Sequence, residues 1–293
     1  MTHAGALLAL HAAVALFAMA GLFGKWLALS ALVIVLGRTL VAAATLALAA
    51  SLRREPVGRP ASALVVNGAI LALHWVTFFL AIQASSVAIG LLGYASFPLF
   101  VLLLERRGAQ HAVTPREWTC AALVLAGFAV LVPRLAWSDA NVQGLALGAV
   151  SGLTFAALAV RNRALLRERL PIGLAFWQNA CAAGWVLVAC MVVPDLVRMP
   201  TAAELVALVL LGAVCTALAH TLFIASLRRV TAQAASIVAG LEPVYGIAFA
   251  ALLLAEVPGP REWAGAALLL AAAILASRRP APASAATAVR PIR

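Results

Sequence analysis

The sequence predicts an all-α, polytopic membrane protein with ten transmembrane helices, arranged as two inverted five-helix repeats. Its composition, the length of its apolar blocks and an internal repeat indicate this fold. The chain has 293 residues, of which 65% are hydrophobic and 11% are charged, and its mean hydropathy is +1.06. A soluble globular domain carries about 25% charged residues, so the composition excludes a soluble domain of ordinary surface.

The apolar blocks are about twenty residues long, which is the length that a helix needs to cross roughly 30 Å of hydrocarbon. We expect spans at 5–24, 30–51, 62–83, 86–104, 117–133, 142–161, 172–193, 203–227, 231–254 and 261–277. The first block is interpreted as a span, because no Lys or Arg precedes it and it is long for a signal peptide.

The positions of the basic residues predict the orientation. The net charge is +11, but the charges lie in short segments between apolar blocks and form no continuous basic face, which argues against nucleic acid as a partner. Sixteen of the 21 Lys and Arg fall on the side that carries both termini, and four fall on the opposite side. Short cytoplasmic loops carry an excess of Lys and Arg, so we expect both termini in the cytoplasm.

A tetrapeptide recurs with an offset of 145 residues. Pro115-Arg116-Glu117-Trp118 returns as Pro260 to Trp263, and the same offset places Pro98 on Pro243 and Phe78 on Phe223. Each copy predicts the start of a helix, with proline at its first position and, in the first copy, a capping box between Thr114 and Glu117.

The repeat divides the chain into two halves, residues 1–137 and 138–279, followed by a tail at 280–293 that we expect to be a disordered cytoplasmic segment. Each half has five predicted spans, and an odd number of spans ends on the opposite side of the membrane from where it began. The second half therefore enters the membrane from the opposite face. Inverted repeats recur in secondary transporters, whose substrate site lies near the midplane between the halves. Channels and a few membrane enzymes also contain repeats.

The chain resembles the drug/metabolite transporter superfamily, in its EamA-type branch, over roughly residues 5–277. The residues that carry the resemblance are Leu241, Glu242, Pro243, Glu256, Pro260 and Trp263 in the second half, with Pro98 and Arg38 in the first. One position departs from the pattern, since His111 stands in the first half at the position equivalent to Glu256, and the nearby Glu105 is out of register.

The resemblance implies transport of small metabolites across the bacterial inner membrane, commonly export of amino acids. It also implies that spans 1–4 and 6–9 surround a central cavity while spans 5 and 10 are peripheral. Among members of the family, the chain is most similar to exporters of aromatic and other neutral amino acids.

Two prolines and two charged residues are candidate functional residues near the midplane. Pro98 and Pro243 are either hinges or gates of the pathway, or static kinks. Glu242 either contacts a substrate ammonium or a coupling proton, or it pairs with Arg38 or caps the broken backbone. Arg38 either receives a substrate carboxylate or makes a structural pair.

Other polar and aromatic residues within spans are candidates for the cavity wall. His74 and His220 occupy nearly equivalent repeat positions and suit proton coupling or structural hydrogen bonding. The aromatic candidates are Trp75, Phe78, Tyr94, Trp177 and Tyr245, and the amide candidates are Gln178, Asn179 and Asn67. Each of them either contacts a ligand or packs between helices.

The repeat and the resemblance together favour an exporter that works by alternating access around a midplane cavity. A passive facilitator or pore for other small metabolites or drugs is the alternative, and a membrane-embedded enzyme is disfavoured because polar candidates are scattered at mid-depth. We predict no catalytic residue, metal or cofactor, and the sequence lacks a nucleotide-binding P-loop. A monomer suffices to enclose a cavity, although the small residues at 264–273 also suit a homodimer.

Overall fold

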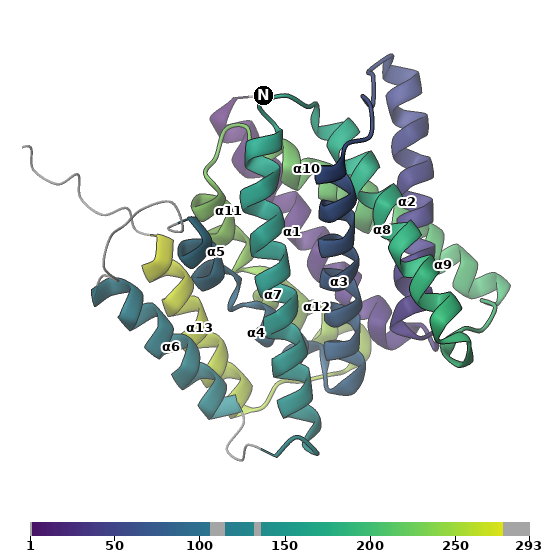
Figure 1. Ribbon diagram of the computed structural model, residues 1–293. Helices are drawn as coiled ribbons and strands as arrows, with labels where there is room; N and C mark the ends of the chain where they lie inside the picture. The colour runs from purple at the N-terminus through teal and green to yellow at the C-terminus, as the bar shows by residue number, and fades with distance from the viewer. Residues whose placement is uncertain (1, 106–114, 132–135, 278–293) are drawn as a thin grey trace, which may run out of the picture.

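The computed structural model describes residues 2–105, 115–131 and 136–277, and every regular element in these ranges is a helix (Figure 1). In chain order they are α1 (His3–Trp26), α2 (Ala31–Arg53), α3 (Ser62–Ala84), α4 (Val87–Tyr94), α5 (Phe97–Glu105), α6 (Pro115–Leu131), α7 (Ala140–Leu165), α8 (Pro171–Val192), the 3₁₀ turn η2 (Pro194–Leu196), α9 (Ala202–Gly212), the π-helix η3 (Ala213–Leu218), α10 (Ala219–Ser226), α11 (Ala232–Ala239), α12 (Glu242–Leu254) and α13 (Pro260–Ser277).

Within the described residues, seven helical stretches are long and apolar enough to cross a membrane, and two further apolar helices are shorter. The seven are α1, α2, α3, α4 with α5, α7, α8, and the continuous segment from α9 to α10. An α-helix satisfies its backbone hydrogen bonds internally, which hydrocarbon requires of any lipid-exposed segment. The chain is therefore a helical multi-pass membrane protein, as its composition predicts.

Local sequence accounts for the helix starts. Ser30, Ser86 and Asp139 accept backbone N–H bonds at the starts of α2, α4 and α7, and Thr201 forms a capping box with Glu204 at α9. The two copies of the repeated tetrapeptide begin α6 and α13 at their prolines, as predicted. Thr114 lies outside the described residues, and so does the predicted tail.

Two predicted spans are broken rather than continuous. The span expected at 86–104 is divided into α4 and α5, and α5 begins one residue before Pro98. The span expected at 231–254 is divided into α11 and α12, and α12 begins one residue before Pro243. Proline lacks the backbone N–H and crowds the preceding turn, so each helix ends before the proline and a new helix starts there.

The segment from α9 to α10 contains a π-helix, η3, that the hydropathy pattern does not indicate. In it the Thr216 hydroxyl donates to the Leu211 carbonyl, five residues earlier, at 2.7 Å. A π-bulge rotates the side chains that follow it relative to a regular helix. In this segment the bulge faces Thr216 toward α2, where Arg38 lies.

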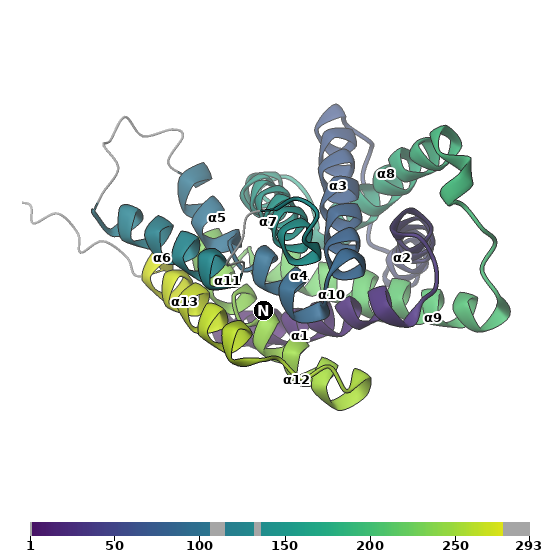
Figure 2. The same ribbon diagram turned by 90° about the horizontal axis from the view of Figure 1, so that it is seen from below.

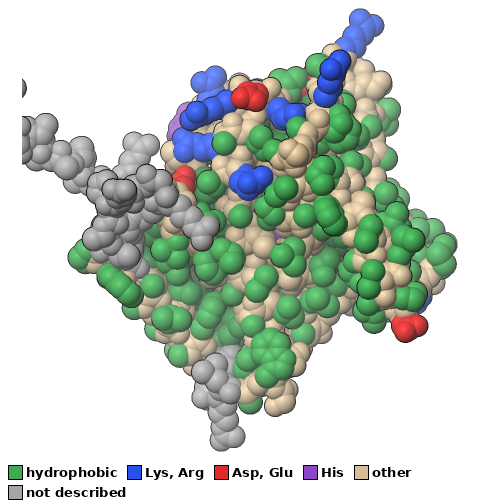
Figure 3. Space-filling model, viewed as in Figure 1, with side chains coloured by type: hydrophobic (Ala, Val, Ile, Leu, Met, Phe, Trp, Pro, Cys, Tyr) green, Lys and Arg blue, Asp and Glu red, His purple; other side chains and the backbone are tan. Residues whose placement is uncertain are grey.

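The helices pack around a core to which helices from early and late in the chain both contribute. The segments α1, α2, α3 and α4 contact α10, α8, α7 and α12 respectively. The helices α6 and α13 pack against each other at one edge, which is visible in both ribbon views (Figures 1 and 2). Lys and Arg side chains gather at the end where α1 begins and α2 ends, while the flanks are largely hydrophobic (Figure 3).

Candidate functional site

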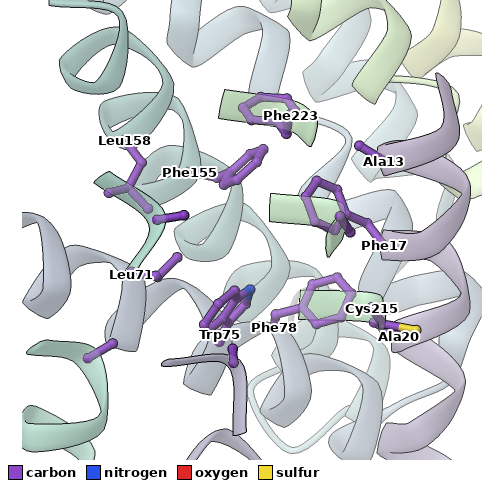
Figure 4. Packing of buried hydrophobic residues seen from close by; sticks show 14 of the residues in the cluster. Ala13, Phe17, Ala20, Leu71, Trp75, Phe78, Phe155, Leu158, Cys215 and Phe223 are labelled. Atoms are coloured by element: carbon purple, nitrogen blue, oxygen red, sulfur yellow. The ribbon is translucent and has the colours of Figure 1, made fainter. Parts of the chain in front are cut away.

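A small buried cavity lies where α1, α2, α3, α4, α7 and α12 meet. Its lining residues are Phe17, Ala20, Arg38, His74, Trp75, Phe78, Tyr94, Phe155 and Glu242. Phe17, Phe155 and Phe223 point toward one another above Trp75 and Phe78 (Figure 4), and the ring centroids of Phe155 and Phe223 are 4.9 Å apart. The cavity is thus an aromatic chamber that contains one arginine, one histidine and one glutamate.

Arg38 is held in place by one hydrogen bond and two aromatic faces. Its Nε donates to the Thr216 hydroxyl at 2.9 Å, and its Cζ lies 4.1 Å from the ring centroid of Trp75 and 5.3 Å from that of Phe79. A guanidinium over an aromatic ring is attracted by the ring quadrupole. These contacts hold the guanidinium at its Nε and against the two aromatic rings, and Arg38 lines the cavity.

Glu242 supplies a buried carboxyl group to the chamber. It is 2% exposed, and it lines the same cavity as Tyr94 and Arg38. Its Oε2 has no hydrogen-bond partner within the described residues. A buried carboxyl oxygen without a partner is costly, and this one belongs to a residue that lines the cavity.

His74 connects the chamber to α7. Its Nδ1 lies 2.8 Å from the Ser151 hydroxyl and 3.0 Å from the Ser151 carbonyl oxygen. Its ring stacks on Phe155, with centroids 4.8 Å apart. An imidazole with two polar contacts and a stacked neighbour is well fixed, so His74 forms part of the wall of the chamber.

His220 lies behind the chamber and not in its wall. Its ring packs on Trp75 at a centroid distance of 5.8 Å, and its Nε2 is 3.0 Å from Gln178 Oε1. Gln178 then donates to Asn162, Asn67 donates to the same Asn162 oxygen at 3.2 Å, and Arg161 donates to Asn67 at 2.5 Å.

These bonds form a buried polar chain that joins α10, α8, α7 and α3. His220, Gln178, Asn162 and Asn67 are each at most 1% exposed. Interhelical hydrogen bonds of this kind hold membrane helices together. This series of hydrogen bonds therefore links four helices, from His220 beside the chamber to Arg161 at its other end.

Besides His220, Gln178 and Asn67, three further predicted cavity residues do not line the chamber. Trp177 donates from its indole nitrogen to the carbonyl oxygens of Val57 and Gly58, at 3.1 and 3.2 Å, and so fixes the segment between α2 and α3. Asn179 donates to the Ala175 carbonyl of its own helix at 2.8 Å. Tyr245 packs against the apolar core.

The structure also brings in residues that the sequence does not distinguish. Phe17, Phe155 and Thr216 contribute to the chamber or hold Arg38. Phenylalanine and threonine are common in apolar spans, so their types carry no signal. The offset of 145 residues relates Phe78 to Phe223, and Phe223 packs on both Phe17 and Phe155, so the repeat was the only available indication of this cluster.

The cavity has a volume of about 20 Å³, counted as the space open to the centre of a water molecule. One water needs about 10–15 Å³ by this measure. The chamber in this conformation therefore has room for about one water. An organic ligand enters only if helices around the chamber move apart.

Comparison with known proteins agrees with the membrane fold. Residues 142–278 match the model of the EamA-like transporter family. The uncharacterized transporter YwfM of Bacillus subtilis (strain 168) is 25% identical over 216 residues, which are 72% of this chain and 71% of that protein. One crystal structure of a protein with 18% identity covers 94% of this chain and 98% of its own, with a TM-score of 0.70, which shows a shared fold.

Proposed function

We propose, on the premise that residues 142–278 form an EamA-like transporter unit, that this chain is a secondary transporter that exports amino acids with aromatic or other neutral side chains. This match supports the resemblance seen in the sequence and favours membrane transport of small molecules. The observation that carries the proposed substrate is that Arg38 and Glu242 line the same aromatic chamber.

The two charges match those of a zwitterion. Arginine recognises carboxylates with two parallel N–H bonds. Because Thr216 accepts only from Nε of Arg38, the two terminal nitrogens are the donors that we assign to the substrate carboxylate. The unpartnered Oε2 of Glu242 offers an acceptor for an ammonium group. Phe17, Phe78 and Phe155 then provide apolar walls for the side chain of the amino acid.

Alternating access explains how a chamber of about 20 Å³ can bind an amino acid, which is larger than that volume. The packed conformation is an occluded one, and the halves rock apart to open it toward either side. The breaks before Pro98 and Pro243 lie beside chamber residues of the same segments, Tyr94 and Glu242. They provide hinges at the depth where the chamber has to widen.

The inverted repeat itself is supported by the register of the broken segments. Val87–Tyr94 and Ala232–Ala239 are separated by 145 residues at both ends, as are the starts of α5 and α12 and of α6 and α13. The packing is also reciprocal, because α3 contacts α7 and α8 while α10 contacts α1 and η3 contacts α2. We therefore assign residues 1–137 and 138–279 to two opposed halves of ten spans in total.

The proposed setting is the bacterial inner membrane, with both termini in the cytoplasm. The gathering of Lys and Arg at one end of the molecule supports this orientation (Figure 3). The two halves enclose the chamber within one chain, so a monomer is sufficient for transport.

Flux through liposomes that contain the purified protein tests the function. We expect saturable uptake of radiolabelled phenylalanine and leucine that unlabelled neutral amino acids compete away. Phenethylamine and phenylpropionate, which each keep one of the two charges, should compete poorly. Flux without saturation would indicate a pore, and no competable flux of any amino acid would overturn the proposed substrate.

A substitution at the anionic residue tests the role of the chamber. Glu242→Gln keeps the shape of the side chain but removes its charge, and it should reduce transport by roughly 10–100-fold, because a hydrogen bond to a charged group contributes about 1.5–3 kcal/mol. Glu204→Gln is the matched control, since Glu204 binds Arg198 at the surface. Unchanged transport in a folded Glu242→Gln protein would contradict the assignment. Repeating the transport assay of both variants with an imposed pH gradient shows whether the Glu242 carboxyl also carries a proton.

A further inference from the structure

A second concave site lies on the outside of the helix bundle, away from the central chamber. It is a groove of about 420 Å³ between α2, the segment from η3 to α10, and the start of α8. Its deeper walls are apolar or small and include Leu46, Ala49, Ala213, Ala217 and Leu222. None of these residues lines the central chamber.

The groove faces the lipid. On the helices that form it, Leu48 is 61% exposed, Leu52 is 77% exposed and Leu218 is 49% exposed. Exposed leucines on a membrane-spanning helix are in contact with acyl chains, since hydrocarbon is the solvent at that depth. What enters the groove from the side is therefore a lipid tail.

Two arginines stand at the polar mouth of the groove. Arg53 is the last residue of α2 and Arg228 follows α10, and both line the groove and are exposed. Glu55 is the acidic residue at the same mouth, so the three side chains carry a net charge of +1. From Thr45, at the deep end, to Arg53 the helix rises by about 12 Å.

An apolar slot with a cationic mouth at the basic end of the molecule is complementary to an anionic amphiphile. We propose that this groove binds one anionic phospholipid, whose phosphate lies between Arg53 and Arg228 and whose acyl chain lies along Ala49 and Ala217. Basic pockets between transmembrane helices recognise anionic head groups in this way. A zwitterionic lipid should bind the groove more weakly, because the same arginines repel its ammonium group.

The lipid would also support the π-helix. Ala213 and Ala217 of η3 form part of the groove, while Thr216 of the same turn holds Arg38 in the chamber. An acyl chain in the groove packs on the outer side of η3 and fills the space between this helix and α2. The phospholipid is thus a structural ligand of the wall that positions Arg38.

Native mass spectrometry of the full chain, titrated with phosphatidylglycerol or phosphatidylethanolamine, tests the site without any transport measurement. We expect one phosphatidylglycerol to bind more tightly than phosphatidylethanolamine. The double variant Arg53→Ala/Arg228→Ala should bind it about 30-fold more weakly, since each arginine near a membrane surface contributes about one kilocalorie per mole. The matched control is Arg54→Ala/Arg229→Ala, which removes the neighbouring arginines outside the groove and should bind normally.

A groove-filling variant separates binding in the groove from adsorption to surface charge. Ala49→Phe leaves both arginines in place and blocks the slot, so it should also lose the bound phosphatidylglycerol. If Ala49→Phe, verified as folded by its thermal unfolding, still retains the lipid, the groove is not the site. Equal loss in both arginine pairs, or equal binding of the two lipids, would likewise overturn the proposal.

Discussion

At the scale of single residues, the chamber depends on how a buried cation is stabilised at membrane depth. Arg38 is 1% exposed, and an arginine within the bilayer is costly unless it is paired or faces water. Its stabilisation is divided among the Thr216 hydroxyl, the Trp75 ring and the field of Glu242. Within the part of the chain that the structure describes, none of these three contacts is a salt bridge, which supports the proposal that the guanidinium binds a substrate carboxylate.

The first prediction concerns the shape of the cation. Arg38→Lys keeps the charge but replaces the planar fork by a point charge with three rotatable donors. We expect the KM for neutral amino acids to rise by roughly 10–100-fold, as for the loss of one charge-assisted hydrogen bond. Arg54→Lys, at the exposed end of α2, should leave KM unchanged. A normal KM in Arg38→Lys would mean that the carboxylate is bound elsewhere.

A second prediction concerns the hydroxyl that orients Arg38. Thr216→Val removes the acceptor of the Arg38 Nε–H and leaves that donor unsatisfied. We expect thermal stability to fall, by an amount equivalent to about 1–3 kcal/mol, and KM to rise. Thr221→Val is the control, because that hydroxyl bonds only to the Ala217 carbonyl of its own helix. Equal effects of the two variants would assign Thr216 a purely local role.

At the scale of elements, close packing and helix breaks set which helices move together. Gly93 on α4 and Gly148 on α7 lie against each other, and a Cβ added at Gly148 would stand 2.7 Å from the Gly90 carbonyl oxygen. Such close approach is the way in which small residues join membrane helices. The two helices α4 and α7 are therefore expected to move as one body, while the breaks before the prolines allow motion elsewhere.

The glycine contact gives a stability prediction with an internal control. In Gly148→Ala the added methyl group pushes the backbones of α4 and α7 apart. Overpacking of this kind lowers the free energy of unfolding by about 1–3 kcal/mol. Gly184→Ala, on α8, meets nothing within 4 Å and should be neutral or slightly stabilising, since alanine favours helix over glycine by about 0.5–1 kcal/mol. Thermal unfolding in detergent should show a lower Tm for the first variant alone. A similar Tm for both would contradict the close packing.

The helix breaks give a kinetic prediction. Pro98→Ala and Pro243→Ala each restore a backbone N–H and permit a continuous helix across the break. If the breaks are hinges, turnover should fall several-fold while the affinity for substrate stays unchanged. Pro171→Ala provides the comparison, because that proline begins the unbroken helix α8. Normal turnover in both hinge variants would leave the breaks as static features.

At the scale of the whole molecule, the distribution of charge and the closed chamber are the two global features. The arginine-rich end defines a proposed cytoplasmic face (Figure 3). The polar chain from His220 to Arg161 links four helices on the side that leads to this end. The proposed opening toward that side would separate some of these hydrogen bonds, so polar contacts as well as aromatic packing stabilise the packed conformation.

Orientation is tested by cysteine labelling. The four natural cysteines, Cys120, Cys181, Cys190 and Cys215, are first replaced by alanine or serine. Glu168 and Asp195 lie in the exposed segments at the two ends of α8. In intact cells an impermeant maleimide should label Asp195→Cys and should reach Glu168→Cys only after permeabilisation. The opposite pattern would reverse the proposed topology.

The sequence by itself determined the features that depend on local composition. Apolar blocks located the membrane helices, and the repeated Pro-Arg-Glu-Trp located the starts of α6 and α13. Pro98 and Pro243 marked where two spans depart from a regular helix, although the prediction was a kink and the structure has a break. These features follow from the cost of burying backbone and from the geometry of proline, which act over a few neighbouring residues. Tertiary structure alone decided which polar groups meet.

Arg38 meets Thr216 and His74 meets Ser151 across 178 and 77 residues of chain, and Trp177 turns away to anchor the segment between α2 and α3. In an apolar span, the presence of a phenylalanine or threonine in the sequence does not reveal which way its side chain points. The direction of each side chain depends on the rotation of its helix, on the π-helix η3 and on close contacts at glycines. The chamber therefore became visible only when helices from both halves were packed together.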